Sequence, residues 1–405
     1  MDTMHTPADY NNIPFAGRDP IYARLKQQIL DPSHTHALVF IGHDGIGKTS
    51  LLTHFTQIFD DPILSIFTSL QTEHYHTFED LLHLMHDGIQ ALLVTHQFSL
   101  SRVPDFDHDE TRSYLTWFDQ HYLPEVWSVI RPHRRIVWLL DDAHHLLRLT
   151  DDERTALHAL SANHPQLSLV LTLNTIYEES LPELQPLVMP VIVERIHRLS
   201  AEASSQIIKQ YAPNVPADWI EQIVQASGRH PRLVARFGET LQNPPDGMTN
   251  FEALQLAVYR DSHEEFRQIW MKRSRDERLV LTAIASLIYD NPLQSVTASR
   301  IETWLVETDY LLDVVTINAV LRSLDYQDII NQQQGAGIQI TTGLFQRWLL
   351  EQARLDEPIT TERGQMSLRL IAIALIVALI VLALVLLVPP AYLEQTAIPT
   401  ATLAT

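Results

Sequence analysis

The chain has 405 residues, a formal net charge of −20 and no cysteine. So acidic a surface repels phosphate and argues against a protein that coats nucleic acid, while the lack of cysteine excludes disulfides, thiolate zinc sites and cysteine nucleophiles. Since one hydrophobic core rarely grows beyond about 250 to 300 residues, we expect two or three domains.

The first 14 residues are polar, which predicts a flexible N-terminus without a secretion signal. The box Phe15-Ala16-Gly17-Arg18-Asp19 follows, ahead of a helical pattern over residues 22–30. The apolar run 37–41 then has the length and the β-branched content of a buried strand.

Residues 42–49 read Gly-His-Asp-Gly-Ile-Gly-Lys-Thr and fit the P-loop pattern G-x-x-x-x-G-K-S/T, with an amphipathic helix predicted over residues 50–59. Glycines let backbone N–H groups close around a triphosphate at the helix N-terminus. Lys48 should reach the outer phosphates, and the Thr49 hydroxyl should bind Mg²⁺. The residues expected to contact the nucleotide in this loop are Gly42, His43, Asp44, Gly45, Ile46, Gly47, Lys48, Thr49 and Ser50.

Between the P-loop and the next chemical element, the pattern predicts a strand over residues 63–67 and a helix over residues 78–94. The acids of residues 99–110 do not have the spacing of an EF-hand and predict a solvated loop. A helical run over residues 114–130 is expected to be interrupted by Pro124.

The second chemical element is an apolar strand over residues 136–140 that ends in Asp141 and Asp142. Ligands of open α/β sheets bind at the carboxyl ends of the strands, so we interpret this element as a Walker B motif. Asp141 is predicted to hold Mg²⁺, and Asp142 to orient or deprotonate the attacking water. The alternative is that both acids cap a helix that begins near Ala143.

Two more strands are predicted, over residues 167–173 and 191–193, and Asn174 stands at the end of the first. Ser200 is a candidate N-cap for the helical region that follows, which extends to Leu241. The alternative for Asn174 is an ordinary turn residue.

Inside that helical region, Ser-Gly-Arg-His-Pro-Arg places Pro231 in the first turn of a helix. Arg232 projects from the same turn, and its guanidinium has the geometry for a bidentate contact with a γ-phosphate. The alternative is a surface arginine without a ligand.

Three helices, over residues 278–289, 297–306 and 316–324, precede a hairpin signal around Gly335, an order that resembles a winged helix. A helix over residues 344–353 follows. The basic cluster of Lys272, Arg273, Arg275 and Arg278 makes DNA an alternative partner. The third helix offers only Arg322 against Asp325, however, so we favour a protein partner over DNA.

Residues 370–388 form an unbroken apolar run that covers about 28 Å as a helix, close to the thickness of a bilayer core. It predicts one transmembrane helix. Arg363 and Arg369 precede the run, so the positive-inside tendency places the large N-terminal part in the cytoplasm.

The order of these motifs resembles that of STAND and origin-recognition-like AAA+ ATPases. The resemblance rests on the Phe15–Asp19 box, the P-loop, the Asp141-Asp142-x-His box, Asn174 and Arg232. It implies that the segment containing Arg18 lines an adenine pocket, that Asn174 is a sensor-1 residue at the γ-phosphate and that Arg232 is a sensor-2 residue. No Lys or Arg lies between Thr172 and Glu194, where ring motors carry an arginine finger, which favours a nucleotide-controlled switch.

We therefore expect an α/β P-loop NTPase core with a parallel sheet, a helical lid, a winged-helix-like domain and one transmembrane helix. The expected segments are residues 1–14, 15–198 (core), 199–255 (lid), 256–355 (winged-helix-like), 356–369 (linker), 370–388 (transmembrane) and 389–405 (tail). The hypothesis is a single-pass cell-membrane ATPase that binds ATP or ADP with Mg²⁺ and acts as a signalling or assembly switch, with self-association left open. The alternatives are a DNA-transaction ATPase and a scaffold that holds nucleotide without turnover.

Overall fold

The computed structural model describes residues 14–31, 37–58, 61–71, 77–104, 113–130, 133–184, 191–291, 295–333 and 337–355. These residues belong to two compact units. One comprises Met1–Ser262 with Leu321–Arg347, and the other His263–Val320 with Trp348–Thr405. The predicted domain boundaries at residues 198 and 255 remain predictions.

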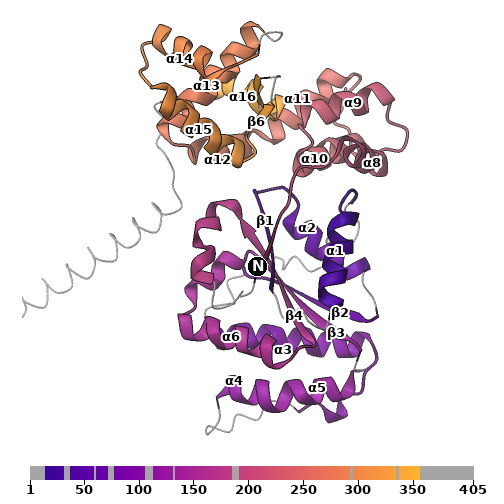
Figure 1. The fold of residues 1–405 in the computed structure, drawn as a ribbon. Coiled ribbons are helices and arrows are strands. Elements are labelled where there is room, and N and C mark those ends of the chain that lie inside the picture. Colours follow the sequence, from indigo (N-terminus) through magenta and orange to yellow (C-terminus); the bar gives the residue numbers. More distant parts are fainter. Residues whose placement is uncertain are drawn as a thin grey trace, which may run out of the picture. The chain divides into compact units, whose positions relative to one another are not determined.

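A five-stranded parallel sheet lies at the centre of the first unit, in the order β2-β3-β4-β1-β5 (Figure 1). Its strands are β1 (Ala37–Gly42), β2 (Ile63–Ser69), β3 (Arg135–Asp141), β4 (Leu167–Asn174) and β5 (Val191–Arg195). Each predicted strand is present, within about two residues of its expected ends. Because parallel strands finish at a common edge, Gly42 pairs with Asn174 and Ser69 with Asp141 there.

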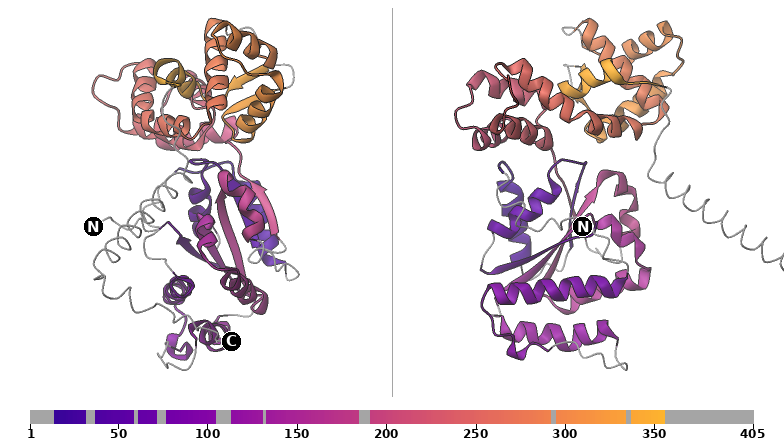
Figure 2. Two further views of the ribbon diagram at one scale, coloured as in Figure 1. Left: turned by 90° about the vertical axis from the view of Figure 1, so that its left-hand side faces the viewer. Right: turned by 180° about the vertical axis from the view of Figure 1, so that it is seen from behind.

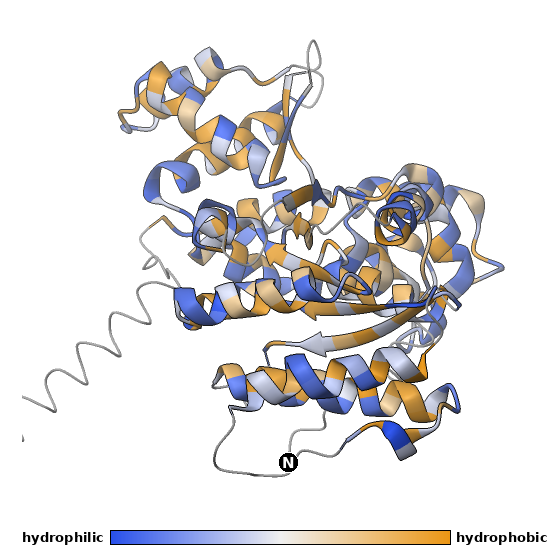
Figure 3. Cartoon of the chain, turned by 60° about the horizontal axis from the view of Figure 1, so that its bottom comes forward, coloured by the Kyte–Doolittle hydropathy of each residue, from blue (hydrophilic) through white to orange (hydrophobic). Residues whose placement is uncertain are grey.

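Helices cover both faces of this sheet (Figure 2). Alternate residues of β1 point to opposite faces: Val39 and Ile41 pack with α3 (Phe78–Thr95) and α6 (Asp151–Asn163), whereas Leu38 and Phe40 pack with α1 (Asp19–Leu30) and α2 (Lys48–Ile58). The strands are therefore apolar on both sides, as expected of a buried parallel sheet. The helices that flank the sheet alternate between hydrophobic and hydrophilic segments (Figure 3).

The predicted interruption at Pro124 is wrong. The chain stays helical from α4 (Tyr114–Trp117) through a π-helical turn (Phe118–Tyr122) into α5 (Leu123–Val129). Pro124 lies in the first turn of α5, directly after the π-helical turn. A π-helical turn changes the hydrogen-bond register, so the missing N–H of proline breaks no helix there.

The predicted lid region folds as α8 (Ala201–Tyr211), α9 (Ala217–Ala226) and α10 (Pro231–Gln242), followed by α11 (Phe251–Asp261). Ser200 caps α8 as expected, because its hydroxyl accepts a hydrogen bond from the Ala203 N–H. Pro231 occupies the first turn of α10.

The remaining elements also follow the predicted order. They are α12 (His263–Met271), α13 (Arg275–Asp290), α14 (Ala298–Glu307), α15 (Val314–Tyr326), β6 (Ile330–Gln333), β7 (Gly337–Ile340) and α16 (Gly343–Gln352). Strands β6 and β7 pair antiparallel, which confirms the hairpin. Their classification as a winged helix remains a prediction.

Two members of the basic cluster, which made DNA an alternative partner, are buried. Arg278 is 1% exposed, and its guanidinium donates to the Trp270 and Met271 carbonyls at the end of α12. Arg273 is 8% exposed and donates to the Ile269 carbonyl. Carbonyls at a helix C-terminus lack intrahelical partners, so two of the four cations satisfy backbone groups.

The predicted transmembrane helix at residues 370–388, with its linker and tail, lies outside the described residues. So do residues 1–13 of the expected flexible N-terminus and residues 105–110 of the acidic loop. Within the described part of the chain, no helix combines the length and the apolar composition needed to cross a bilayer.

Candidate functional site

The P-loop holds Lys48 at the first turn of α2. Its ammonium donates to the Gly42 carbonyl at 2.9 Å and to the His43 carbonyl at 3.0 Å. The side chain is buried, and burial lowers its pKa. Gly45 and Gly47 have φ values of +74° and +93°, a backbone region that side chains disfavour. The loop can therefore turn its N–H groups inward.

The two predicted magnesium ligands are in direct contact. The Thr49 hydroxyl donates to one oxygen of Asp141 at 2.6 Å, and the Thr172 hydroxyl donates to the other. Asp141 is 2% exposed, so these bonds fix the orientation of its carboxylate. A hydroxyl and a carboxylate are oxygen ligands that suit Mg²⁺, which takes its other ligands from phosphates and water. The donor set therefore fits the predicted metal.

Asp142 follows in a left-handed backbone conformation, with φ of 56°. Its N–H donates to the Thr172 hydroxyl at 3.0 Å, and its side chain forms no capping bond to the 3₁₀ turn Ala143–Arg148. The capping alternative is therefore absent for Asp142. Burial, together with the neighbouring Asp141 carboxylate, raises the pKa of Asp142 to about 6.

Asn174 reaches the P-loop because β4 lies between β1 and β3. Its amide donates to the Asp44 carboxylate, and its side-chain oxygen accepts from the Ile176 N–H at 3.2 Å. Next to it, Thr175 bonds with the His43 ring at 2.8 Å. Burial lowers the pKa of His43 to about 4, so this imidazole is neutral at pH 7.

The Phe15–Asp19 box lies between the P-loop and α8. Arg18 is buried and donates to the Ile46 carbonyl at 3.2 Å. Both backbone groups of Phe15 bond to the side chain of Gln210 on α8, at 3.0 and 3.3 Å. The Phe15 ring stacks on His54, with the ring centroids 4.1 Å apart.

Gly17 in this box combines a φ of +78° with a very close neighbour, since an added Cβ would lie 2.3 Å from the Cβ of Ala203. We expect Gly17→Ala to lower the free energy of unfolding by roughly 2 to 4 kcal/mol, the sum of backbone strain and overpacking. Gly247→Ala is the matched control, because Gly247 has a φ of +81° and nothing within 4 Å. Chemical denaturation measures the free energy of unfolding of both variants, and the difference between them is the contribution of the contact with Ala203. An equal decrease in both variants would show that α8 moves aside freely.

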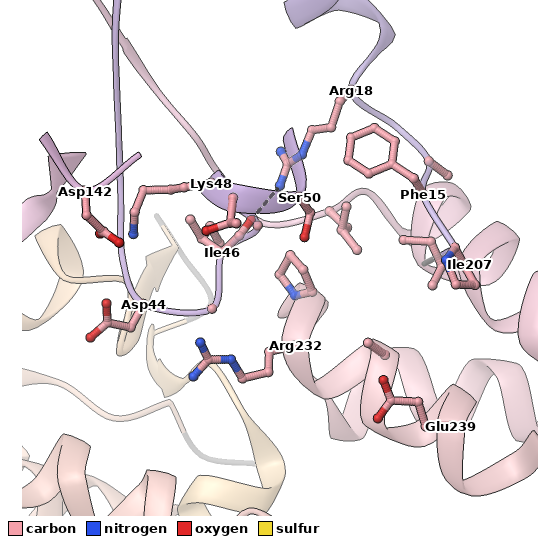
Figure 4. Close-up of a pocket in the computed structure, with 18 of the residues that line it drawn as sticks. Phe15, Arg18, Asp44, Ile46, Lys48, Ser50, Asp142, Ile207, Arg232 and Glu239 are labelled. Atoms are coloured by element: carbon pink, nitrogen blue, oxygen red, sulfur yellow. Dashed lines mark hydrogen bonds between the residues drawn. The ribbon is translucent and has the colours of Figure 1, made fainter. Parts of the chain in front are cut away.

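Arg232 and Pro231, at the start of α10, meet the tip of the P-loop. The Arg232 N–H donates to the Gly45 carbonyl at 3.3 Å, and an added Cβ on Gly45 would lie 2.8 Å from the Arg232 Nε. Figure 4 shows the Arg232 guanidinium beside Asp44, with Lys48 and Asp142 on the other side of the loop. Arg232 therefore lies next to the P-loop, where the sensor-2 interpretation requires it.

These residues surround a cavity of about 360 Å³ (Figure 4), within the usual range of about 300 to 1,000 Å³ for small-molecule sites. Of the predicted site residues, the cavity is lined by Arg18, Asp44, Gly45, Ile46, Gly47, Lys48, Thr49, Ser50, Asp142, Pro231 and Arg232. Gly42, His43, Asp141 and Asn174 stand behind this lining and contact it. Phe15 and Ile207 of α8 add an apolar wall, and Glu239 of α10 adds an acidic one.

No protein-family model matches the sequence, and no curated protein matches it. Among solved structures, the Walker-type ATPase PABY2304 of Pyrococcus abyssi matches 82% of this chain and 95% of its own, with 17% identity and a TM-score of 0.55. This chain has the α/β fold of a P-loop ATPase. Two weaker matches, with TM-scores too low to bear on function, are Aeropyrum pernix ORC1 in complex with DNA (0.39, 14% identity, 85% and 94% coverage) and the Thermotoga maritima RuvB branch migration motor (0.38, 13% identity, 80% and 92% coverage).

Sequence reasoning missed several side chains of this P-loop site besides Ile207 and Glu239, and two of them contact the Walker B acids. Thr172 orients Asp141, and a polar residue two positions before Asn174, within the fully buried part of a mostly apolar strand, was the available signal. Gln71 also lines the cavity, and its hydrogen bond to Asp142 acts to lower the pKa of that carboxyl. It follows β2, and no pattern in the sequence singled it out.

Proposed function

We propose that the chain is a membrane-anchored ATPase of the STAND or AAA+ type that binds ATP with Mg²⁺ and acts as a nucleotide-controlled switch. The observation that carries the proposal is the single cavity around which Lys48, Thr49, Asp142 and Arg232 converge. Its size and its mixture of basic, acidic and apolar walls fit a nucleotide better than they fit an inorganic anion alone.

Each group has a separate task in this proposal. Lys48 gives up two carbonyl partners and places its ammonium on the outer phosphates. Thr49 and Asp141 would hold Mg²⁺, which neutralises charge on the phosphates. Asp142 accepts the proton of the attacking water, for which a pKa near 6 is suited, since the carboxylate is ionised at pH 7 yet still basic.

Two residues would report the third phosphate. Asn174 exchanges the Asp44 carboxylate for a phosphate oxygen or the attacking water, and Arg232 contributes the lid's positive charge. Both contacts depend on the γ-phosphate, which ADP lacks. The state of the nucleotide is thereby transmitted to α10.

Slow turnover is part of the proposal. The first arginine after the lysine- and arginine-free segment 172–194 is Arg195, and it is already engaged. Its guanidinium donates to Glu178 and to the Tyr326 hydroxyl, and it lies 4.4 Å from the Tyr326 ring centroid. An arginine committed in this way does not serve as a trans-acting finger.

The direct test is a titration of the full-length chain with a fluorescent ATP analogue, with and without Mg²⁺, beside an assay of phosphate release. Saturable, magnesium-dependent binding and slow release are the expected results. Binding without release above background would select the scaffold alternative. Failure to bind any nucleoside triphosphate would remove the proposal.

Asp44→Asn is expected to tighten ATP binding by roughly three- to tenfold, because one negative charge near the phosphates opposes them by about 1 kcal/mol. Asparagine retains an oxygen that accepts the Asn174 amide. ADP should gain less, since it carries less charge. Competition titrations check this, with the exposed Asp246→Asn as a control of equal net charge; unchanged affinity would mean that Asp44 faces away from bound nucleotide.

The membrane anchor at residues 370–388 and the cytoplasmic location of the N-terminal domains belong to the proposal as well. They are supported by the apolar run and the arginines that precede it. Detergent-dependent extraction from membranes and protease protection of the tail test them. A protein partner for the winged-helix-like domain is favoured over DNA, since Arg273 and Arg278 are buried.

A further inference from the structure

The turn between α14 and α15 exposes apolar side chains that the fold does not use. Leu311 is 88% exposed, Val315 is 78% exposed and Val306 is 55% exposed. Leu311 and Val315 are the two most exposed large hydrophobic residues in the part of the chain that the structure describes. We call Val306, Leu311 and Val315 the turn surface.

These residues are not core positions that failed to pack. On α14 the buried positions are Ile301 and Leu305, and on the adjacent part of α15 Ile317 is fully buried. The inward stripe of each helix is therefore already filled, and Val306 and Val315 lie on the other side. Monomeric proteins rarely expose clustered apolar residues unless the surface binds something.

The turn is also well ordered by its own hydrogen bonds. The Tyr310 N–H donates to the Leu305 carbonyl at 2.8 Å, which ends α14, and the Asp313 carboxylate accepts from the Thr316 N–H at 2.7 Å, which caps α15. Leu311 is thus presented on a short segment fixed at both ends. A preorganised surface loses little entropy when a partner binds.

The charge around the turn surface selects the partner. Glu307, Asp309 and Asp313 alternate with the apolar residues, and no Lys or Arg occurs from Ile301 to Leu321. All three carboxylates are exposed. Nucleic acids and anionic lipids are repelled by such a surface, whereas lysine and arginine side chains are attracted to it.

We propose that the turn surface docks an amphipathic helix of a partner protein whose apolar face is flanked by Lys and Arg. Leu311 inserts between side chains of that apolar face, Val306 and Val315 extend the dry contact, and the carboxylates pair with the flanking cations at the rim. The inference rests on the proposed protein-contact role of this domain and is independent of nucleotide binding.

The test uses the full-length chain in nanodiscs of zwitterionic lipid and three labelled synthetic peptides, followed by fluorescence anisotropy against empty nanodiscs. One peptide is an 18-residue Leu/Lys helix with all its leucines on one face; the second has the same composition in scrambled order; the third replaces Lys with Glu. The peptide length of about 18 residues gives about five helical turns. We expect the amphipathic Leu/Lys peptide to bind at least about tenfold more tightly than the other two.

Leu311→Asp is the decisive variant, because it removes the apolar contact while adding a negative charge. Binding of the amphipathic Leu/Lys peptide should fall about tenfold or more, although simple charge attraction would increase it. Val94→Asp is the matched control: Val94 is 60% exposed on α3 and belongs to the first unit. Val315→Asp should repeat the loss.

Several outcomes would overturn the proposal. They are equal binding of the scrambled peptide, no binding of any peptide, and unchanged binding by Leu311→Asp. Binding of the wild-type chain to phosphatidylcholine vesicles that Leu311→Asp removes would reassign the surface to lipid. Because Lys48→Ala should keep peptide binding while it loses nucleotide, a failure of this inference is distinguishable from a failure of the proposed function.

Discussion

Lys48→Ala is expected to weaken ATP binding by at least about 100-fold, which corresponds to about 3 kcal/mol. The chain has four lysines, and Lys48 is the one that lines the cavity. Its ammonium bonds to the Gly42 and His43 carbonyls of the P-loop, and alanine leaves no cation at this position. Isothermal titration with ATP and Mg²⁺ measures the loss.

A matched variant separates this effect from a general loss of charge. Lys26 lies on the exposed side of α1, and Lys26→Ala should bind ATP as the wild-type chain does. The melting temperature of each variant shows that the fold persists. Wild-type affinity in Lys48→Ala would contradict the assignment of the cavity to nucleotide.

Asp142→Asn is expected to reduce phosphate release by about 10²- to 10⁴-fold while ATP still binds. Asparagine matches the shape of the carboxyl group and keeps the backbone N–H that bonds to Thr172, but it does not accept a proton from water. Phosphate release under saturating ATP measures the rate, and a binding titration on the same sample measures the affinity. A rate that survives the change would transfer the role of base to another group or leave turnover unassisted.

The pH dependence of the wild-type chain gives a second readout of the same residue. Since the pKa of Asp142 is raised to about 6, the carboxylate is protonated below that pH, and phosphate release should fall about tenfold per pH unit in the acid limb. Release should level off above about pH 7. The residual activity of Asp142→Asn should lack this limb.

As pH rises towards 6, the stability of the wild-type chain should fall while its rate of phosphate release rises. A carboxyl whose pKa is about 6 in the folded chain and 3.8 ordinarily binds its proton more tightly when folded, so it favours the folded state below pH 3.8 and loses that contribution as pH rises to about 6. Asp142→Asn removes the ionised group. The variant should therefore gain in melting temperature relative to the wild-type chain between pH 4 and pH 6, which also shows that its loss of activity is not unfolding.

Local patterns in the sequence were sufficient for the P-loop, the Walker B strand and the order of the helices. Each of these depends on residues that are neighbours in the chain: the glycine spacing from Gly42 to Gly47, the apolar run before Asp141, and the first-turn Pro231. Such features are physically local, because backbone conformation and strand burial are set within a few residues.

Contacts between distant segments were beyond the reach of these patterns. The approach of Gly17 to Ala203, the bond that Thr172 donates to Asp141 and the bond that it accepts from the Asp142 N–H follow from strand order and helix packing. In the sequence, Gly17 is recognisable only as a member of the Phe15–Asp19 box. Its close neighbour, which gives the residue its expected effect on stability, lies 186 positions along the chain and becomes visible only in the fold.

Two local rules failed because context outweighed them. Pro124 was expected to interrupt a helix, but it lies in the first turn of α5, directly after a π-helical turn. At that position the helix continues without the N–H that proline lacks. Arg273 and Arg278 belong to the basic cluster that made DNA an alternative partner, but the end of α12 presents carbonyls that need donors, and these two guanidinium groups supply them. In both places the demand of backbone hydrogen bonding decided the outcome.

The two hydrogen bonds between the Gln210 side chain and the Phe15 backbone have a mechanical consequence. The Gln210 side chain on α8 accepts a hydrogen bond from the Phe15 N–H and donates one to the Phe15 carbonyl. Three residues later, Arg18 donates to the Ile46 carbonyl of the P-loop. We therefore expect a rotation of α8 to carry the segment ahead of α1 with it as long as these hydrogen bonds hold. Through Arg18, the same rotation would shift the backbone of the glycine-rich loop, so α8 and the P-loop are mechanically coupled.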